Sequence, residues 1–213
     1  INRTISKKNK TIFTKFGSLR HFSNYFTAID LVYRNVYEAL HRTNDILGFM
    51  ILIDGKKEAA LLREQLKKEV SDLKIKYNKV PGLTVILIGD LTPSQIYVRN
   101  KEKSANEVGL KSDVIKYPDS VEEKVILEKI DELNKDNSVS GILVQLPLPK
   151  HIDKQKIIEA IDPSKDVDGF HPMNVGNLSS GYESSVPCTP LGCYLLIKKI
   201  EPNLNGKKAV VVG

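Results

Sequence analysis

The stretch from residue 81 to residue 109 constrains the fold of this 213-residue chain more than any other part. Residues 84–88 form a short apolar run rich in β-branched side chains, which predicts a strand buried on both faces. A helix is expected over residues 93–108, with Gly109 ending it in the left-handed conformation. This succession of strand, turn and helix is typical of a parallel α/β sheet.

The start of this helix carries capping signals. Thr92 offers a hydroxyl group for the N-cap, and Pro93 fits the first helical position. Gln95 stands three residues after Thr92, as in a capping box. We therefore expect Thr92 and Gln95 to cap the first turn.

Three side chains of the helix share one face, because Ser94, Tyr97 and Lys101 are spaced at i, i+3 and i+7. This face begins at the C-terminal end of a buried strand, where open α/β sheets bind ligands. An aromatic ring and an ammonium group one turn apart can hold a flat ring and donate a proton to it. The same pair is also common on solvated helix faces, where the lysine stem lies over the ring.

Strands and helices alternate through most of the chain. Further strands are expected at 51–53, 112–117, 140–146 and 208–212, and further helices at 56–77, 121–134, 153–161 and 191–200. Such alternation predicts a parallel sheet with crossover helices, and hence a three-layer α/β fold. In the second of these helices, the residues expected to face the core are Val125, Ile126, Ile130 and Leu133.

Residues 162–190 interrupt the alternation. They are rich in Gly, Pro, Asn, Ser and Asp, and a loop of this length in a compact chain is usually functional or disordered. Just before them, Pro147 and Pro149 remove backbone donors, so the strand that reaches Gln145 must stop there.

Composition narrows the classes of function. The chain is 41% hydrophobic and 27% charged, as in soluble globular proteins, and no apolar run reaches the length of a membrane span. We therefore expect no membrane partner. Its two cysteines and four scattered histidines match no zinc pattern, so we expect no metal site either.

The basic charge is concentrated at the N-terminal end. Residues 1–49 hold eight Lys and Arg against three Asp and Glu, which is +5 of the net charge of +6. The nearly neutral remainder predicts no nucleic-acid partner.

Residues 1–28 contain no acidic residue, which suits a transit peptide for a mitochondrion or plastid, a disordered tail, or translated sequence upstream of the true start. Without a transit peptide, we expect a cytoplasmic protein.

Four groups of residues fall at expected strand ends or in loops: Tyr97 with Lys101, Gln145 with the following Leu-Pro-Leu-Pro, Lys-Asp-Val-Asp-Gly at 165–169, and Pro-Cys-Thr-Pro at 187–190. In this order and spacing they resemble the bifunctional methylenetetrahydrofolate dehydrogenase/methenyltetrahydrofolate cyclohydrolase family of the FolD type. The resemblance extends over residues 50–213 and begins with Met-Ile-Leu-Ile-Asp-Gly-Lys at 50–56.

The resemblance implies roles for individual residues. Lys101 would be the catalytic lysine, needed chiefly for the cyclohydrolase reaction, and Tyr97 would stack on the folate ring system and help to orient Lys101. Gln145 would hydrogen-bond the lysine, and Asp168 would bind the pterin end of the folate. The implied substrate-binding residues are Ser94, Tyr97, Val98, Arg99, Asn100, Lys101, Val144, Gln145, Leu146 and Asp168.

The residues also have structural interpretations. Gln145 could merely cap a strand end, and Asp168 with Gly169 could form a plain turn. The residues expected to be structural rather than catalytic are His171, Cys188, Thr189 (as an N-cap) and Cys193.

The resemblance also implies an activity. The enzyme would oxidise 5,10-methylenetetrahydrofolate with NADP and hydrolyse the 5,10-methenyl product to 10-formyltetrahydrofolate, in one-carbon metabolism and purine biosynthesis. Opening the methenyl bridge requires attack by water on a cationic carbon and protonation of a leaving nitrogen, which suits a lysine beside a cationic substrate. The implied partners are tetrahydrofolate derivatives and a second copy of the chain, as a homodimer.

Three segments are expected: a basic extension at 1–49, a folate-binding catalytic domain at 50–190, and the start of a Rossmann-like NADP-binding domain at 191–213. In the family the last strand leads into a Gly-Arg-Ser turn, so Gly213 would be the first residue of the cofactor-binding loop. Two alternatives stay open. The chain could be an inactive or folate-binding-only fragment that lacks the cofactor domain, or an amino-acid or shikimate-type dehydrogenase on the same two-domain plan.

Overall fold

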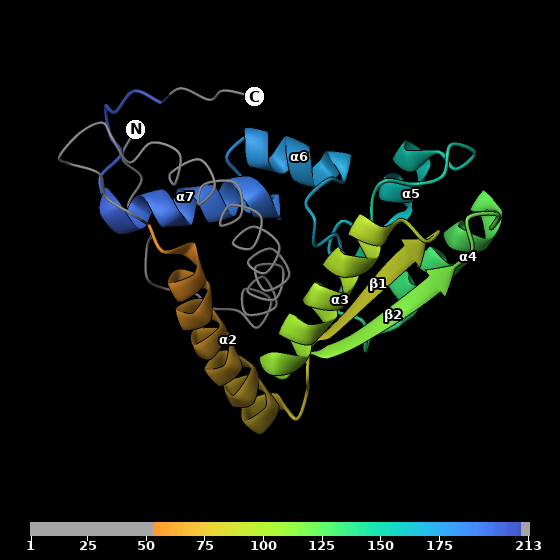
Figure 1. Cartoon of the computed structure of the whole chain (residues 1–213), viewed down its shortest axis with the longest axis horizontal. Coiled ribbons are helices and arrows are strands. Elements are labelled where there is room, and N and C mark those ends of the chain that lie inside the picture. The colour runs from red at the N-terminus through yellow and green to blue at the C-terminus, as the bar shows by residue number, and fades with distance from the viewer. Residues whose placement is uncertain (1–52, 210–213) are drawn as a thin grey trace.

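The computed structural model describes residues 53–209, in which strands and helices alternate (Figure 1). In chain order, the elements are α2 (Gly55–Tyr77), β1 (Gly82–Ile88), α3 (Thr92–Glu107), β2 (Lys111–Tyr117), α4 (Glu123–Lys135), β3 (Gly141–Val144), α5 (Lys154–Ala160), α6 (Pro172–Ser179) and α7 (Cys188–Ile200). The predicted α/β class is confirmed, and each element predicted to lie wholly within residues 53–209 has a counterpart.

The described strands form one parallel sheet in the order β2-β1-β3. β1 lies in the centre, and all seven of its residues are buried. Because both edges of β1 are paired and both of its faces are covered, the strand carries the continuous apolar run from which it was predicted. β3 is shorter than expected, since it ends at Val144, directly before Gln145.

Helices cover both faces of the sheet, which makes three layers (Figure 1). α3 covers one face, where the packed residues are Leu83, Val85, Leu87, Val98, Leu143 and Val167. α4 and α5 cover the other, where the packed residues include Ile86, Ile88, Ile126, Ile130, Ile142 and Ile157. Alternate residues of β1 point to opposite faces, so this one strand anchors both layers.

α2 packs on α3 rather than on the sheet. Leu66 and Val70 of α2 contact Ala105, Val108 and Leu110 at the C-terminal end of α3. This second contact holds the end of α3 that lies away from the C-terminal edge of the sheet, and so fixes the helix along its length.

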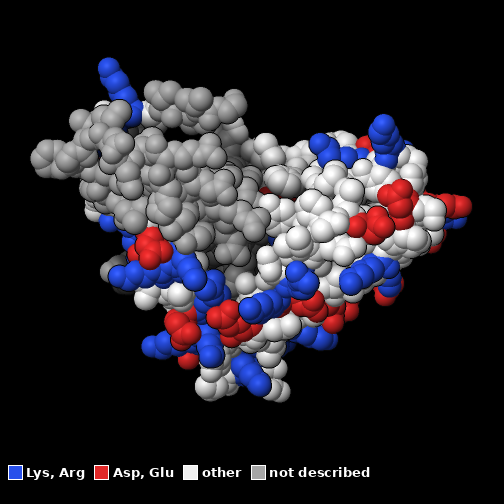
Figure 2. Space-filling model, in the orientation of Figure 1, with Lys and Arg blue, Asp and Glu red and all other residues white. Residues whose placement is uncertain are grey.

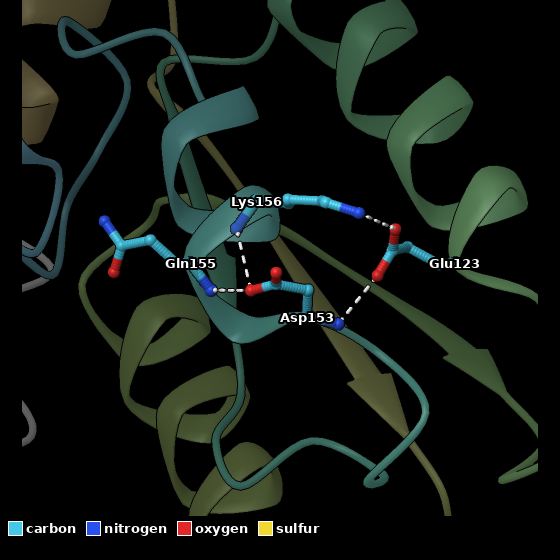
Figure 3. A network of polar contacts seen from close by, with 4 residues as sticks. All are labelled: Glu123, Asp153, Gln155 and Lys156. Carbon is cyan, nitrogen blue, oxygen red and sulfur yellow. Dashed lines mark hydrogen bonds and ion pairs between the residues drawn. The ribbon is translucent and has the colours of Figure 1, made fainter.

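The starts of α4 and α5 are tied together by the polar network in Figure 3. The Glu123 carboxylate accepts a hydrogen bond from the backbone N of Asp153 at 2.7 Å and pairs with Lys156 Nζ at 3.2 Å. Asp153 in turn caps α5 by accepting from the backbone N of Gln155 at 2.8 Å. These contacts lower the pKa of Glu123, first through the Asp153 N–H and then through Lys156.

The predicted capping box is wrong. α3 begins at Thr92 itself, Leu91 occupies the N-cap position, and no side chain caps the helix. A hydroxyl group caps a helix only from the non-helical position before it, which Thr92 does not occupy. Gln95 Nε2 donates instead to the backbone O of Asp90 at 3.0 Å. Thr189 is likewise not an N-cap, because it lies within α7.

Val125 does not face the core as predicted, since its side chain is 40% exposed. Ile126, Ile130 and Leu133 are buried and fill the inward stripe at i, i+4 and i+7. Val125 lies one position to the side of that stripe, where a hydrophobic side chain can remain partly solvated.

Residues 162–190 are not a single irregular loop, because they contain α6. His171 caps this helix by accepting at Nδ1 from the backbone N of Met173 at 3.1 Å, and Pro172 occupies its first turn. The structural role predicted for His171 is confirmed. α6 contains Asn174 and Gly176, residues of low helix propensity, so composition alone pointed to a loop.

Several predictions concern residues outside 53–209: the extension at 1–49, most of the strand at 51–53, the end of the strand at 208–212, and Gly213. Where these strands enter the described range, at Ile53 and at residues 208–209, the backbone is irregular. α7 continues across the expected domain boundary after residue 190, and the division into domains stays a prediction.

Within residues 53–209, no helix combines the length and the apolar character that a membrane span requires. Figure 2 shows Lys and Arg interspersed with Asp and Glu over the described part of one face. The expected absence of a nucleic-acid partner stays a prediction.

Candidate active site

A lysine and a glutamine from different elements meet at the C-terminal edge of the sheet. Lys101 lies in the third turn of α3, and its Nζ donates to Oε1 of Gln145 at 3.2 Å. The backbone N of Gln145 donates to the backbone O of Ile86 at 2.9 Å, which extends the parallel pairing of β1 and β3 by one residue. The Gln145 side chain is held as well, since its Nε2 donates to the backbone O of Leu146 at 2.8 Å. The amide oxygen is thereby directed at the lysine.

Asp168 lies within electrostatic reach of Lys101. Burial raises the pKa of the Asp168 carboxyl above its ordinary value, and the neighbouring Lys101 ammonium opposes this effect without cancelling it. The negative charge of Asp166 raises the pKa further, and the Cys188 thiol, 3.9 Å from Asp168 Oδ1, lowers it. The site therefore holds a carboxyl group that is costly to ionise without a further donor.

Tyr97 lies one helical turn before Lys101 and is 40% exposed. An exposed ring beside an ammonium group is available for a flat ligand to stack on. Ser94, one turn earlier, is only 5% exposed, so little of its side chain can touch a ligand.

The other predicted substrate-binding residues differ in accessibility. Val98 is buried between α3 and the sheet, and Val144 is buried on the opposite face of the sheet. Arg99 and Asn100 are exposed, and Arg99 lies about 200° around α3 from Tyr97. Leu146 is half-buried beside Gln145. The structure therefore brings together Tyr97, Lys101, Gln145 and Asp168, and the substrate contacts of all ten residues stay predictions.

A buried network that the sequence did not indicate supports the loop that carries Asp168. Asp166 accepts at Oδ1 from the backbone N of Gly169 at 3.0 Å, and at Oδ2 from the backbone N of His171 at 2.9 Å and from Asn174 Nδ2 at 2.8 Å. Ser184 Oγ lies 2.8 Å from the backbone O of Asn174 and donates to it. The network depends on a turn that closes over eight residues, so spacing alone could not reveal it.

Gly169 is required in this turn by its conformation and by its surroundings. Its φ is +70°, and a Cβ atom there would meet the backbone O of Ser185 at 2.9 Å. The turn is thus packed directly against the segment that leads to Cys188.

Lys165 belongs to the fold rather than to the site. Its Nζ donates to the backbone O of Leu133 at 2.8 Å and of Asp136 at 2.7 Å, so it caps the C-terminal end of α4. Burial lowers the pKa of this ammonium group.

The expectation that the chain holds no metal ion stays a prediction. Among residues 53–209, no group of three or more His, Cys, Asp or Glu is arranged to hold a metal ion. The predicted cofactor contact, Gly213, lies outside the described residues. What the arrangement offers is a lysine that can exchange protons, an amide that orients it, a carboxyl that can accept N–H donors, and an exposed aromatic ring.

Comparison with known proteins shows that the chain is similar to tetrahydrofolate enzymes. The family model for the tetrahydrofolate dehydrogenase/cyclohydrolase catalytic domain matches residues 53–168. The bifunctional protein FolD of Pelagibacter ubique is 80% identical over 164 residues, which are 77% of this chain and 58% of that protein.

Solved structures agree with this similarity. The bifunctional FolD dehydrogenase/cyclohydrolase of Campylobacter jejuni matches with a TM-score of 0.75 and 49% identity, over 78% of this chain and 58% of that one. The FolD of Trypanosoma brucei, solved with NADP cofactor and an inhibitor, matches with a TM-score of 0.69 and 32% identity, over 74% of this chain and 54% of that one. The chain thus spans a little over half the length of the relatives that it matches.

Proposed function

The chain belongs to the tetrahydrofolate dehydrogenase/cyclohydrolase family, and on this premise we propose that its site hydrolyses 5,10-methenyltetrahydrofolate to 10-formyltetrahydrofolate. We propose further that the natural polypeptide containing these residues also oxidises 5,10-methylenetetrahydrofolate with NADP. The observation that carries the proposal is the convergence of Lys101, Gln145 and Asp168 from three separate segments.

The hydrolytic step follows from the chemistry of these side chains. Water attacks the cationic carbon of the methenyl bridge, and the neutral amine of Lys101 accepts the proton that the water loses. The resulting ammonium donates this proton to the leaving nitrogen as the C–N bond breaks, which regenerates the amine. The hydroxyl group left on the bridge carbon loses its own proton to solvent as it becomes the formyl carbonyl, so one proton is released overall. The positive charge of the substrate favours the neutral amine while both are bound side by side.

Gln145 and Asp168 support this step in different ways. The Gln145 amide oxygen accepts a hydrogen bond from Lys101 Nζ and so orients the amine, whereas a carboxylate in its place would hold the lysine as an ammonium. The Asp168 carboxyl accepts hydrogen bonds from amino and ring N–H groups of the pterin, which are stronger donors than the Cys188 thiol that it has in the free protein.

The oxidative activity rests on residues beyond those described. NADP would supply the hydride acceptor, and no proton transfer by Lys101 is needed for that step. The folate would be held by Tyr97, Lys101, Gln145 and Asp168. The FolD of Trypanosoma brucei, which was solved with NADP, supports this choice of cofactor. We also propose a cytoplasmic homodimer.

The amino-acid or shikimate-type alternative is not favoured, because the relatives and solved structures are folate enzymes. The folate-binding-only alternative is an outcome that experiment can distinguish.

Replacing Lys101 by Met in the natural polypeptide tests the division of labour. We expect hydrolysis of 5,10-methenyltetrahydrofolate to fall by about two to four orders of magnitude, the usual contribution of a general acid–base. Oxidation of 5,10-methylenetetrahydrofolate should fall much less, since it needs the lysine only for binding. Steady-state rates of both reactions measure this ratio.

The matched control is Lys103→Met, which removes an exposed ammonium from another face of the same helix and should change neither rate. Equal loss of both activities in Lys101→Met would contradict the role given to the lysine.

A further inference from the structure

A second carboxyl group, Asp166, lies beneath the loop that carries Asp168 and is only 3% exposed. Its backbone is anchored to the sheet, because residues 142 and 166 form a parallel bridge and the backbone N of Ile142 donates to the backbone O of Lys165 at 2.8 Å. The loop therefore leaves the sheet at a fixed point, two residues before Asp168.

The Asp166 side chain then fixes the other side of the same loop. Its two oxygens accept from the backbone N–H groups of Gly169 and His171 and from the Asn174 amide, at 2.8 to 3.0 Å. Asp168 is held between the anchored residue 166 and the tied residue 169. Its carboxyl has little freedom to move away from Lys101.

All three donors to Asp166 are neutral, and within residues 53–209 no Lys, Arg or His forms an ion pair with it. Neutral N–H groups satisfy the lone pairs of a carboxylate but leave its charge in place. That charge acts on Asp168 and raises the pKa of its carboxyl.

We propose that Asp166 is a positioning residue of this site, which holds Asp168 beside Lys101. Its negative charge, which no ion pair compensates, disfavours the ionised form of Asp168 unless an N–H donor binds that carboxyl. The inference rests on the proposed function, in which that donor belongs to the pterin. Asp166 thereby has an electrostatic effect on Asp168 in addition to the hydrogen bonds by which it holds the loop.

The groups that face Asp168 act in opposite directions. Burial is the largest effect and raises its pKa, the Lys101 ammonium on α3 lowers it, the Asp166 charge raises it, and the Cys188 thiol on α7 lowers it. Removing the Asp166 charge should therefore shift the titration of Asp168 to lower pH.

The test compares Asp166→Asn with Ser184→Ala in the 213-residue chain. Asp166→Asn keeps the shape and removes the charge, whereas Ser184→Ala loosens the same network through Asn174 and keeps both charges. We would follow the Asp168 carboxyl by ¹³C NMR during a pH titration, with Asp168→Asn to assign the signal. Asp166→Asn should titrate at lower pH than the wild type, and Ser184→Ala should titrate with the wild type.

Kinetics supply the second readout, in the natural polypeptide. Asp166→Asn should raise KM for 5,10-methenyltetrahydrofolate about fivefold, the factor that one net hydrogen bond is worth, with a smaller change in kcat. If Asp166→Asn does not fold, Asn174→Ala removes one of the three donors and should still raise KM.

Unchanged titration of Asp168 in Asp166→Asn, or an equal shift in Ser184→Ala, would overturn the electrostatic role. An unchanged KM in both Asp166→Asn and Asn174→Ala would overturn the positioning role. The titration requires no substrate, so a failure of the proposed hydrolysis in the wild type would not be mistaken for a failure of this inference.

Discussion

Asp168 shows how local surroundings decide the state of a single side chain. The Lys101 ammonium favours its ionised form, but burial and the Asp166 charge outweigh that effect, so the pKa is raised. A carboxyl in this position is costly to ionise, because burial disfavours the charged form. In the proposed site, Asp168 thus gives up some stability of the free protein in return for affinity for the pterin.

The pH dependence of stability tests this account. Because the pKa of Asp168 is higher in the folded chain than in the unfolded chain, its contribution is fully present below about pH 4, the ordinary aspartate range, and is lost as the pH rises through the folded value. Asp168→Asn removes this loss. The free energy of unfolding of the variant, from urea denaturation, should match the wild type near pH 4 and exceed it near pH 8.

The control for that comparison is Asp113→Asn, which changes an exposed carboxyl on β2. Its difference from the wild type should not grow with pH. A stability gap for Asp168→Asn that is the same at both pH values would contradict the raised pKa.

At the scale of elements, the sequence-based predictions were accurate where burial imposes a regular pattern of apolar residues, and they failed where other contacts hold an element. β1 was predictable because a central parallel strand must be apolar on both faces. The burial of Ile126, Ile130 and Leu133 was predictable because one stripe of α4 faces the core. α6 was missed because its stability comes from the His171 cap and from the buried Asn174 rather than from helix propensity. The start of α3 was misplaced by one residue because a threonine in the first turn resembles one at the cap.

Two glycines of different elements provide a matched pair of predictions. Gly176 lies inside α6 and a Cβ atom there would meet nothing within 4 Å, so Gly176→Ala should stabilise the fold by about 0.5–1 kcal/mol. Gly82 is the first residue of β1, and a Cβ atom there would clash with the backbone O of Ser138, so Gly82→Ala should destabilise the fold by about 1–3 kcal/mol. Thermal melts of the two variants check both signs, and a loss of stability in Gly176→Ala would show that α6 is not held as described.

At the scale of the whole molecule, the fold brings residues of three segments to one edge of the sheet. α3 supplies Tyr97 and Lys101, the end of β3 supplies Gln145, and the loop after α5 supplies Asp168. These four residues were predicted because the motifs that contain them resemble a known family. Residue type marked Asp166 as suited to a turn, but the role that we propose for it was not predicted, since that role depends on the closure of the loop around its carboxylate.

The most direct test of the central claim is the loss of absorbance of 5,10-methenyltetrahydrofolate in the presence of the 213-residue chain, with Lys101→Met and Lys103→Met beside it. We expect turnover by the wild type and by Lys103→Met, and a rate about two to four orders of magnitude lower with Lys101→Met. Equal rates for the wild type and Lys101→Met would contradict it. So would turnover that is absent both in this chain and in the natural polypeptide.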